Sequence, residues 1–183
     1  PALTLGAFFA PLTFALRQIR RDMRTFSPVF LIRAMARKRW LGYGGGGSAS
    51  GLLGVDRSLD AAALATLNLQ LRCPSARDEQ RVRHGDFFDL VPGTVPGFDA
   101  VVGNPPYVQQ EDLGASGGPR DRYRDAVVRG AGVRLSGRSD LHCYFWPHAA
   151  RFLADGGRMG LLSSSQWLDA GYGETLRRWI AEH

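Results

Sequence analysis

The chain has 183 residues, enough for one domain with a sizeable core, and its hydrophobic content of 44% and charged content of 22% are typical of globular proteins. The sequence has no run of 18 or more apolar residues and no signal-peptide pattern, which argues against a membrane span and against secretion. Basic residues outnumber acidic ones by 23 to 17, giving a net charge of +6, and almost all of them are arginine. This balance suits a partner with a phosphate backbone, although a GC-rich genome would also produce it.

The two cysteines, Cys73 and Cys143, lie far apart and have no metal-ligand spacing. We therefore expect two thiols in a reducing cytoplasm, with neither a disulfide framework nor a metal site. The chain opens at Pro1 and stops at His183, inside a helical pattern. Both ends therefore suggest a fragment of a longer protein.

In the first third of the chain, two helices are predicted over residues 7–20 and 28–39. Residues 42–51 are rich in glycine and serine and predict a loop. Residues 52–56 then predict a short buried strand that ends in an acidic residue.

The next predicted element is a helix that Ser58 caps at its start. Leu64, Leu67 and Leu71 follow at i, i+3 and i+7, which predicts that they form its buried apolar face.

Further along, residues 81–84 predict a weak strand and residues 98–102 a clear buried one that Gly103 ends. A polar, glycine-rich region, residues 109–138, has little hydrophobic periodicity and predicts a long loop.

The last quarter of the chain predicts a helix around residues 141–152, a turn at residues 156–157, a strand over 158–163 and a final helix over 172–180. Strands that alternate with helices predict an α/β fold with a mostly parallel, doubly wound sheet.

In this fold, Asp56, Asp86 and Asn104 each fall at the carboxyl end of a predicted strand. Ligands of doubly wound sheets bind at those ends, so these residues are the first candidates for a site.

The strongest motif is Asn104-Pro105-Pro106-Tyr107, directly after the predicted strand. Methylation of an exocyclic amine needs acceptors for the amine hydrogens, because the nitrogen lone pair is otherwise delocalised into the ring. The Asn104 side-chain oxygen and the Pro105 carbonyl could serve, and the two prolines restrict the backbone that carries them. Tyr107 offers an aromatic face for a base rotated out of a duplex. The motif could otherwise be only a strand-ending turn.

Residues 98–108 resemble the catalytic motif of the N6-adenine DNA methyltransferases, and the chain is similar to the methyltransferase part of type IIG-like restriction-modification enzymes. The resemblance covers nearly all of residues 1–183 and implies a Rossmann-like class I fold. It also implies a partial catalytic domain that uses S-adenosylmethionine and acts on double-stranded DNA with a flipped adenine. A target-recognition domain and a nuclease would lie elsewhere in such a protein.

The same resemblance implies the cofactor-binding residues. Gly6 falls in the glycine-rich first motif, Asp56 would bind the ribose hydroxyls, and Asp86 with Phe87 would hold the adenine of the donor. Asp140 falls in a later motif beside the cofactor pocket. In isolation, the three acids also suit helix caps or turns and Phe87 suits a core position. Their joint spacing around Asn104 favours the functional interpretation.

The first motif departs from the family pattern, because Leu3-Thr4-Leu5 stands where the family has Cys-Gly-Ser and the leading aspartate is missing. Side chains there replace the close backbone approach that glycine permits. We therefore expect this chain by itself to bind the cofactor weakly.

Three other functions are compatible with the motifs. A methyltransferase acting on protein glutamine or on RNA adenine would need the same Asn104 chemistry. An impaired DNA-binding fragment would keep the fold without the transfer.

Overall fold

A computed structural model describes residues 27–42, 51–74, 81–95, 97–107 and 119–183. Gly6 and the predicted helix over residues 7–20 lie outside these ranges. Along the chain, the elements are α2 (Ser27–Trp40), β1 (Gly54–Asp56), α3 (Leu59–Arg72), β2 (Val82–His84), the 3-10 turn η3 (Phe87–Asp89), β3 (Phe98–Gly103), α4 (Pro119–Ala131), α5 (Leu141–Ala150), β4 (Leu153–Leu161), α6 (Gln166–Asp169), the 3-10 turn η5 (Gly171–Gly173) and α7 (Glu174–Glu182).

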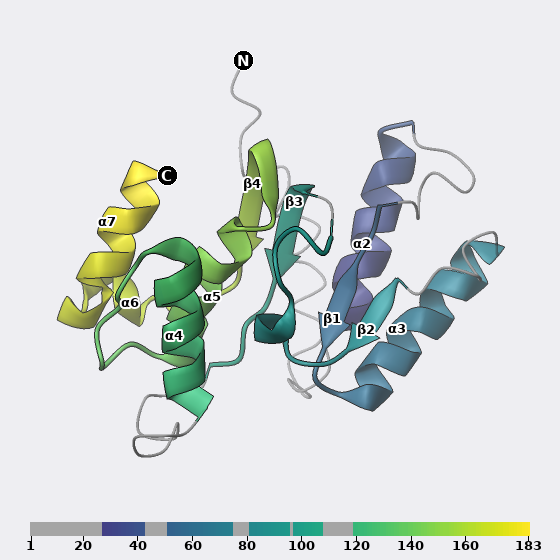
Figure 1. The fold of residues 1–183 in the computed structure, drawn as a ribbon. Helices are drawn as coiled ribbons and strands as arrows, with labels where there is room; N and C mark the ends of the chain where they lie inside the picture. The colour runs from purple at the N-terminus through teal and green to yellow at the C-terminus, as the bar shows by residue number, and fades with distance from the viewer. Residues whose placement is uncertain (1–26, 43–50, 75–80, 96, 108–118) are drawn as a thin grey trace.

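The strands form two parallel pairs. β1 pairs with β2, and β3 pairs with β4, so an α/β fold with parallel strands is confirmed. The prediction of one doubly wound sheet is not met in the described residues, where each sheet has two strands. Figure 1 shows β3 and β1 facing each other across the middle of the molecule. No described strand pairs with β1 or β3 on the sides that face each other, so hydrogen bonds do not join the two sheets.

The described residues form two hydrophobic cores on opposite sides of the molecule. α2 and α3 pack with the β1–β2 pair around Leu31, Met35 and Leu69. On the other side of the molecule, α4, α5, α6 and α7 enclose a larger core that includes Val127 and Tyr144.

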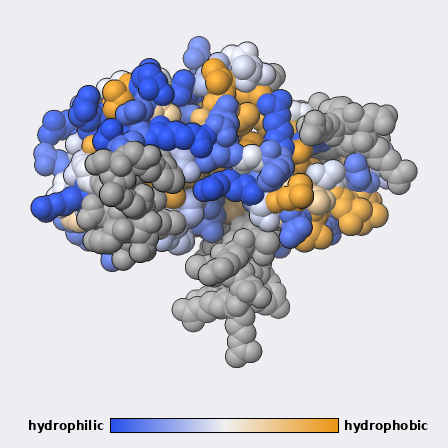
Figure 2. Space-filling model, turned by 60° about the horizontal axis from the view of Figure 1, so that its bottom comes forward, coloured by the Kyte–Doolittle hydropathy of each residue, from blue (hydrophilic) through white to orange (hydrophobic). Residues whose placement is uncertain are grey.

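The buried face of α3 is not the one that the leucine spacing predicts. Leu64, Leu67 and Leu71 are 49%, 50% and 67% exposed, whereas Leu69 is 2% exposed. The buried face consists of small residues together with that leucine: Ala61, Ala62, Ala65 and Leu69. The small side chains allow α3 to approach α2 closely. The face of α3 that is buried is therefore the one that permits this close approach, not the one with the larger side chains. Figure 2 shows exposed hydrophobic residues gathered at the end of the molecule where α3 lies in Figure 1.

Replacing Leu69 by alanine is expected to lower the free energy of unfolding by about 2–5 kcal/mol, because the change leaves a cavity between α2 and α3. Leu67→Ala, the same change on the exposed face, should stay within about 0.5 kcal/mol of the unchanged chain. Urea unfolding followed by circular dichroism measures both. Equal losses in the two variants would contradict this assignment of the faces.

Two further predictions in the second half of the chain were wrong. Residues 109–138 are not one long loop, because α4 occupies Pro119–Ala131. Tyr123 and Val127 stand at i and i+4 on its buried face, and Arg124 pairs with Asp121 one turn earlier. Two apolar residues give little periodicity in sequence, yet they suffice where the helix covers a core.

β4 is the other difference, since it begins at Leu153 and passes through the turn predicted at residues 156–157. Phe98 pairs with Leu153, but Ala100 pairs with Arg158, so β4 bulges between these two pairs. Gly157 is required there, because an added Cβ would lie 2.9 Å from the Phe98 carbonyl oxygen.

No helix among the described residues is long and apolar enough to cross a membrane.

Candidate active site

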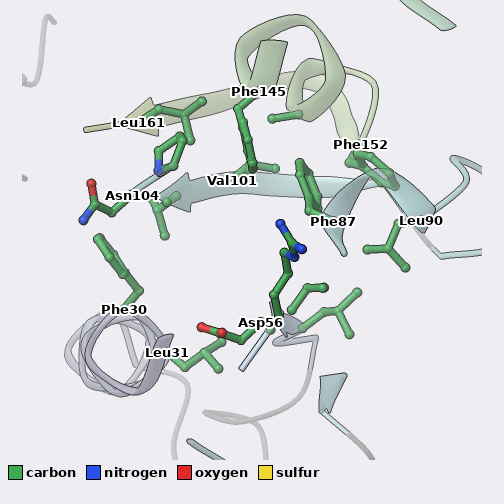
Figure 3. Close-up of a pocket in the computed structure, with 18 of the residues that line it drawn as sticks. Phe30, Leu31, Asp56, Phe87, Leu90, Val101, Asn104, Phe145, Phe152 and Leu161 are labelled. Atoms are coloured by element: carbon green, nitrogen blue, oxygen red, sulfur yellow. The ribbon is translucent and has the colours of Figure 1, made fainter. Parts of the chain in front are cut away.

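A cavity of about 1040 Å³ lies between the two strand pairs and is called the central cavity below. Strands β1 and β3 line it from opposite sides, α2 contributes Phe30 and Leu31, and α5 contributes Phe145. Figure 3 shows Leu31 and Asp56 on one side, facing Val101 and Asn104 on the other. Most of the lining is apolar, and its polar side chains come from the carboxyl ends of strands and the turns after them, with Tyr123 of α4 added, as expected for a ligand site in an α/β protein.

Asp56 is the last residue of β1, and its side chain lines the central cavity. Its Oδ1 accepts a hydrogen bond of 2.8 Å from the Ser58 backbone nitrogen at the start of α3. Ser58 itself caps α3 through the Ala61 backbone nitrogen, as predicted. The turn therefore fixes one carboxylate oxygen, and a carboxylate has further lone pairs that can accept hydroxyl hydrogens.

Asp86 follows β2 and lines the same cavity, next to Phe87. Its Oδ1 accepts a hydrogen bond of 3.0 Å from the Phe88 backbone nitrogen, which orients the carboxylate at the start of η3. Two arginines supply positive charge, since Arg57 Nε lies 4.0 Å and Arg122 Nη1 lies 3.6 Å from Asp86 Oδ2. Because both side chains are substantially exposed, these pairs contribute little to stability.

Phe87 stacks against Phe145 of α5, with ring centroids 5.9 Å apart and planes 16° apart. Both rings line the central cavity, so an aromatic wall stands beside the Asp86 carboxylate. Such a wall suits a flat, planar group such as a purine base.

Asn104-Pro105-Pro106-Tyr107 follows β3, and all four residues line the central cavity. The Tyr107 hydroxyl donates a hydrogen bond of 2.7 Å to Asn104 Oδ1, so the motif itself uses one of the two lone pairs of the candidate acceptor. Tyr107 is 45% exposed, and its ring meets the buried His142 edge-to-face at 6.1 Å. Partial burial raises the pKa of the Tyr107 hydroxyl, which keeps it protonated as a donor.

Asp140 is the one predicted site residue in the described ranges that does not line the central cavity. It precedes α5 without a side-chain cap, and its Oδ2 accepts a hydrogen bond of 2.9 Å from the Tyr172 hydroxyl. The structure therefore brings together Asp56, Asp86, Phe87 and the Asn104 motif, and it places Asp140 in the packing between α5 and η5.

Sequence reasoning missed Tyr123 and His148, both of which contact this site. Tyr123 donates a hydrogen bond of 2.8 Å to Asp86 Oδ2. His148 stacks on Phe88 at 4.4 Å and bonds the Phe87 carbonyl oxygen at 3.1 Å. Tyr123 could have been found as the one aromatic residue in a polar stretch, whereas nothing in the spacing of His148 distinguishes it.

His148 is neutral in the folded protein. Because a carbonyl oxygen only accepts hydrogen bonds, Nε2 carries the proton, and Nδ1 accepts from Arg151 at 3.4 Å. Burial lowers the pKa of His148 from 6.5 to about 4, and the neighbouring Arg151 adds to this effect.

The unfolded chain therefore binds the His148 proton more readily than the folded one, so stability is fully present above pH 6.5 and falls as the pH drops towards about 4. The expected loss is about 3 kcal/mol. Urea unfolding at a series of pH values measures it. His148→Gln keeps an N–H donor without a titrating group and should show a shallower loss. An unchanged pH slope in this variant would contradict the assignment.

The cavity, the strand ends that line it and the Asn-Pro-Pro-Tyr turn define an α/β fold with a candidate ligand site at its strand ends. Residues 65–183 match the family model described as Eco57I restriction-modification methylase. The chain belongs to this family.

Curated relatives agree with this assignment. The chain is 29% identical over 125 residues to the Type II methyltransferase M.XamI of Xanthomonas campestris pv. amaranthicola. The matched segment covers 68% of the chain and 23% of that protein. The chain is 31% identical over 131 residues to M.PaeR7I of Pseudomonas aeruginosa, covering 69% of the chain and 21% of that protein. M.XhoI of Xanthomonas vasicola is 39% identical over 85 residues. The chain spans less than a quarter of the length of these relatives.

Proposed function

We propose that this chain is the catalytic part of a site-specific DNA methyltransferase that transfers a methyl group from S-adenosylmethionine to N6 of adenine. The observation that carries the proposal is that Asn104, Asp56 and Asp86 line one cavity, each at or just after the carboxyl end of a strand in a parallel pair. Membership of a restriction-modification methylase family supports DNA as the substrate, and the net charge of +6 suits a phosphate backbone.

The residues present fit S-adenosylmethionine. Asp56 offers carboxylate lone pairs to ribose hydroxyls, and Asp86 offers them to the 6-amino group of the donor's adenine. Phe87 and Phe145 supply an aromatic wall for that base. When bound, S-adenosylmethionine supplies a methyl group activated by the positive charge on sulfur.

The Asn104 motif acts on the other partner, the target adenine. Asn104 Oδ1 accepts one N6 hydrogen and the Pro105 carbonyl the other, which localises the nitrogen lone pair for attack. The amine then forms the nitrogen–carbon bond, the pair of the broken carbon–sulfur bond stays on sulfur, and the surplus N6 proton leaves to water. The Tyr107 hydroxyl uses one of the two lone pairs of Asn104 Oδ1, so the second can accept the amine hydrogen, and the Tyr107 ring offers a face on which the base can stack.

On this proposal the two strand pairs are halves of one doubly wound class I methyltransferase sheet. Residues 1–183 form a partial catalytic domain, and a target-recognition domain with a possible nuclease belongs to the full-length protein. Double-stranded DNA is the partner, and sequence readout lies with the recognition domain.

The test is methyl transfer from labelled S-adenosylmethionine to duplexes with and without adenine, followed by digestion and nucleoside analysis. N6-methyldeoxyadenosine from the adenine duplex supports the proposal, and methylated cytosine would contradict it. RNA duplexes and a glutamine peptide as competing substrates test the two other methyl acceptors.

A second candidate is an impaired fragment that binds DNA without transferring a methyl group, which Leu3-Thr4-Leu5 in the first motif favours. Calorimetric titration with S-adenosylmethionine separates the two functions. The triple change Leu3→Cys, Thr4→Gly and Leu5→Ser restores the family residues and should raise cofactor affinity. Saturable binding without this change would argue for the enzyme.

A further inference from the structure

The Asp86 carboxylate is held from a second direction by α4. The Tyr123 hydroxyl donates a hydrogen bond of 2.8 Å to Asp86 Oδ2, while Oδ1 accepts from the Phe88 nitrogen at 3.0 Å. The Tyr123 ring packs against Phe88 with centroids 4.5 Å apart and is 4% exposed. Both oxygens of this carboxylate are therefore fixed by donors on separate elements, η3 and α4.

This arrangement leaves part of the carboxylate available to a ligand. Each carboxylate oxygen can accept about two hydrogen bonds, so one donor on each leaves an acceptor site free. Asp86 and Tyr123 both line the central cavity, and the Asp86 side chain is 10% exposed. The free acceptor sites of Asp86 are thus preorganised rather than left to rotate about χ2.

The nearby arginines do not fix the carboxylate in the same way. Arg57 is 71% and Arg122 48% exposed, and their closest nitrogens lie 4.0 Å and 3.6 Å from Asp86 Oδ2. Arg122 also bonds Asp89. At these distances neither arginine makes a hydrogen bond that would set the direction of the Asp86 lone pairs. Tyr123 is the side chain that does.

We propose that Tyr123 is a positioning residue that aligns Asp86 to accept the 6-amino group of the donor's adenine and so makes the site select an adenine nucleoside. This inference rests on the proposed function, because it assumes that Asp86 holds that base. Along the chain, α4 is the next described helix after the Asn104 motif. On the proposed function, the motif therefore contacts the target base, and α4 supports the residue that holds the cofactor.

The test compares the affinities of two compounds for the chain by calorimetry. S-adenosylhomocysteine carries the 6-amino donor, and S-inosylhomocysteine carries a 6-oxo acceptor that Asp86 repels. The unchanged chain should prefer the adenosyl compound. In Tyr123→Phe, which keeps the ring against Phe88, this preference should fall about 3–10-fold, the range for the net contribution of one ordinary hydrogen bond, because Tyr123 acts through Asp86 and does not touch the base. Affinity for the inosyl compound should stay within about twofold.

Two further variants are controls, one expected to remove the preference for the adenosyl compound and one expected to keep it. Asp86→Asn should abolish the preference, since the amide can present a donor or an acceptor to either base. Tyr172→Phe removes the same hydroxyl from Asp140, a carboxylate that does not line the central cavity, and should leave the preference unchanged. Melting curves of each variant show whether it is folded.

The outcomes separate the two claims. Binding of neither compound by the unchanged chain contradicts the proposed function and this inference with it. A preference that Asp86→Asn removes and Tyr123→Phe retains in full keeps the proposed function and overturns the inference. Tighter adenosyl binding in Tyr123→Phe also overturns it, because the hydroxyl would then compete with the base.

A structure of the S-adenosylhomocysteine complex gives a second measurement that needs no variant. The Tyr123 hydroxyl should remain within hydrogen-bond distance of Asp86 Oδ2 while the adenine 6-amino group bonds the same carboxylate. A hydroxyl displaced by the base would overturn the inference.

Discussion

Asn104→Ala is expected to lower the rate of methyl transfer to adenine by at least about 100-fold, the cost of removing one preorganised group that stabilises a transition state. The side-chain oxygen is the acceptor that the amine hydrogen needs, and its place at the end of β3 fixes it against the cavity. Single-turnover assays with saturating duplex and labelled S-adenosylmethionine measure the rate. Cofactor affinity should stay within about threefold, since Asp56 and Asp86 are unchanged.

Two control variants test whether the loss of rate is due to the Asn104 side-chain oxygen. Asn104→Asp keeps an oxygen acceptor and should retain more activity than alanine. Asn68→Ala removes a half-buried asparagine that donates to the Leu64 carbonyl oxygen within α3, away from the central cavity, and should leave the rate unchanged. An Asn104→Ala rate within tenfold of the unchanged chain would remove Asn104 from the mechanism.

Asp56→Asn is expected to weaken S-adenosylmethionine binding about 10–100-fold. Hydrogen bonds to a charged acceptor contribute about 1.5–3 kcal/mol, and an amide offers the ribose hydroxyls one oxygen without the charge. The turn at Ser58 should survive, because the asparagine oxygen can still accept from its backbone nitrogen. Calorimetric titration gives the affinity, and the melting temperature checks the fold.

Asp60→Asn is the matched control for this change. Asp60 lies four residues further on, in the first turn of α3, and is exposed outside the cavity lining. The same loss of charge there should leave cofactor affinity within about twofold. Equal losses in both variants would mean that Asp56 acts through long-range charge rather than by contact.

Much of the site could be predicted from local sequence, because a polar residue directly after a short apolar run indicates the end of a strand. Apolar runs followed by Asp56 and by the Asn104 motif predicted strands that end there, and β1 and β3 do. The cap at Ser58 was predicted for the same reason, since a capping hydroxyl needs only the next three residues. Parallel pairing of β1 with β2 sets Asp56 and Asp86 at neighbouring strand ends, and the packing of the β3–β4 pair brings Asn104 to the same cavity.

What the sequence by itself determined is thus the alternation of strands and helices, the family resemblance and the residues at the strand ends. Only the tertiary structure decided which face of α3 is buried, since the spacing of its alanines and of its leucines suits a helix equally well and the neighbour α2 selects one. It also decided that Tyr123 meets Asp86 and that Asp140 meets Tyr172. Contacts between residues more than 30 positions apart depend on how whole elements pack, and no local pattern encodes them.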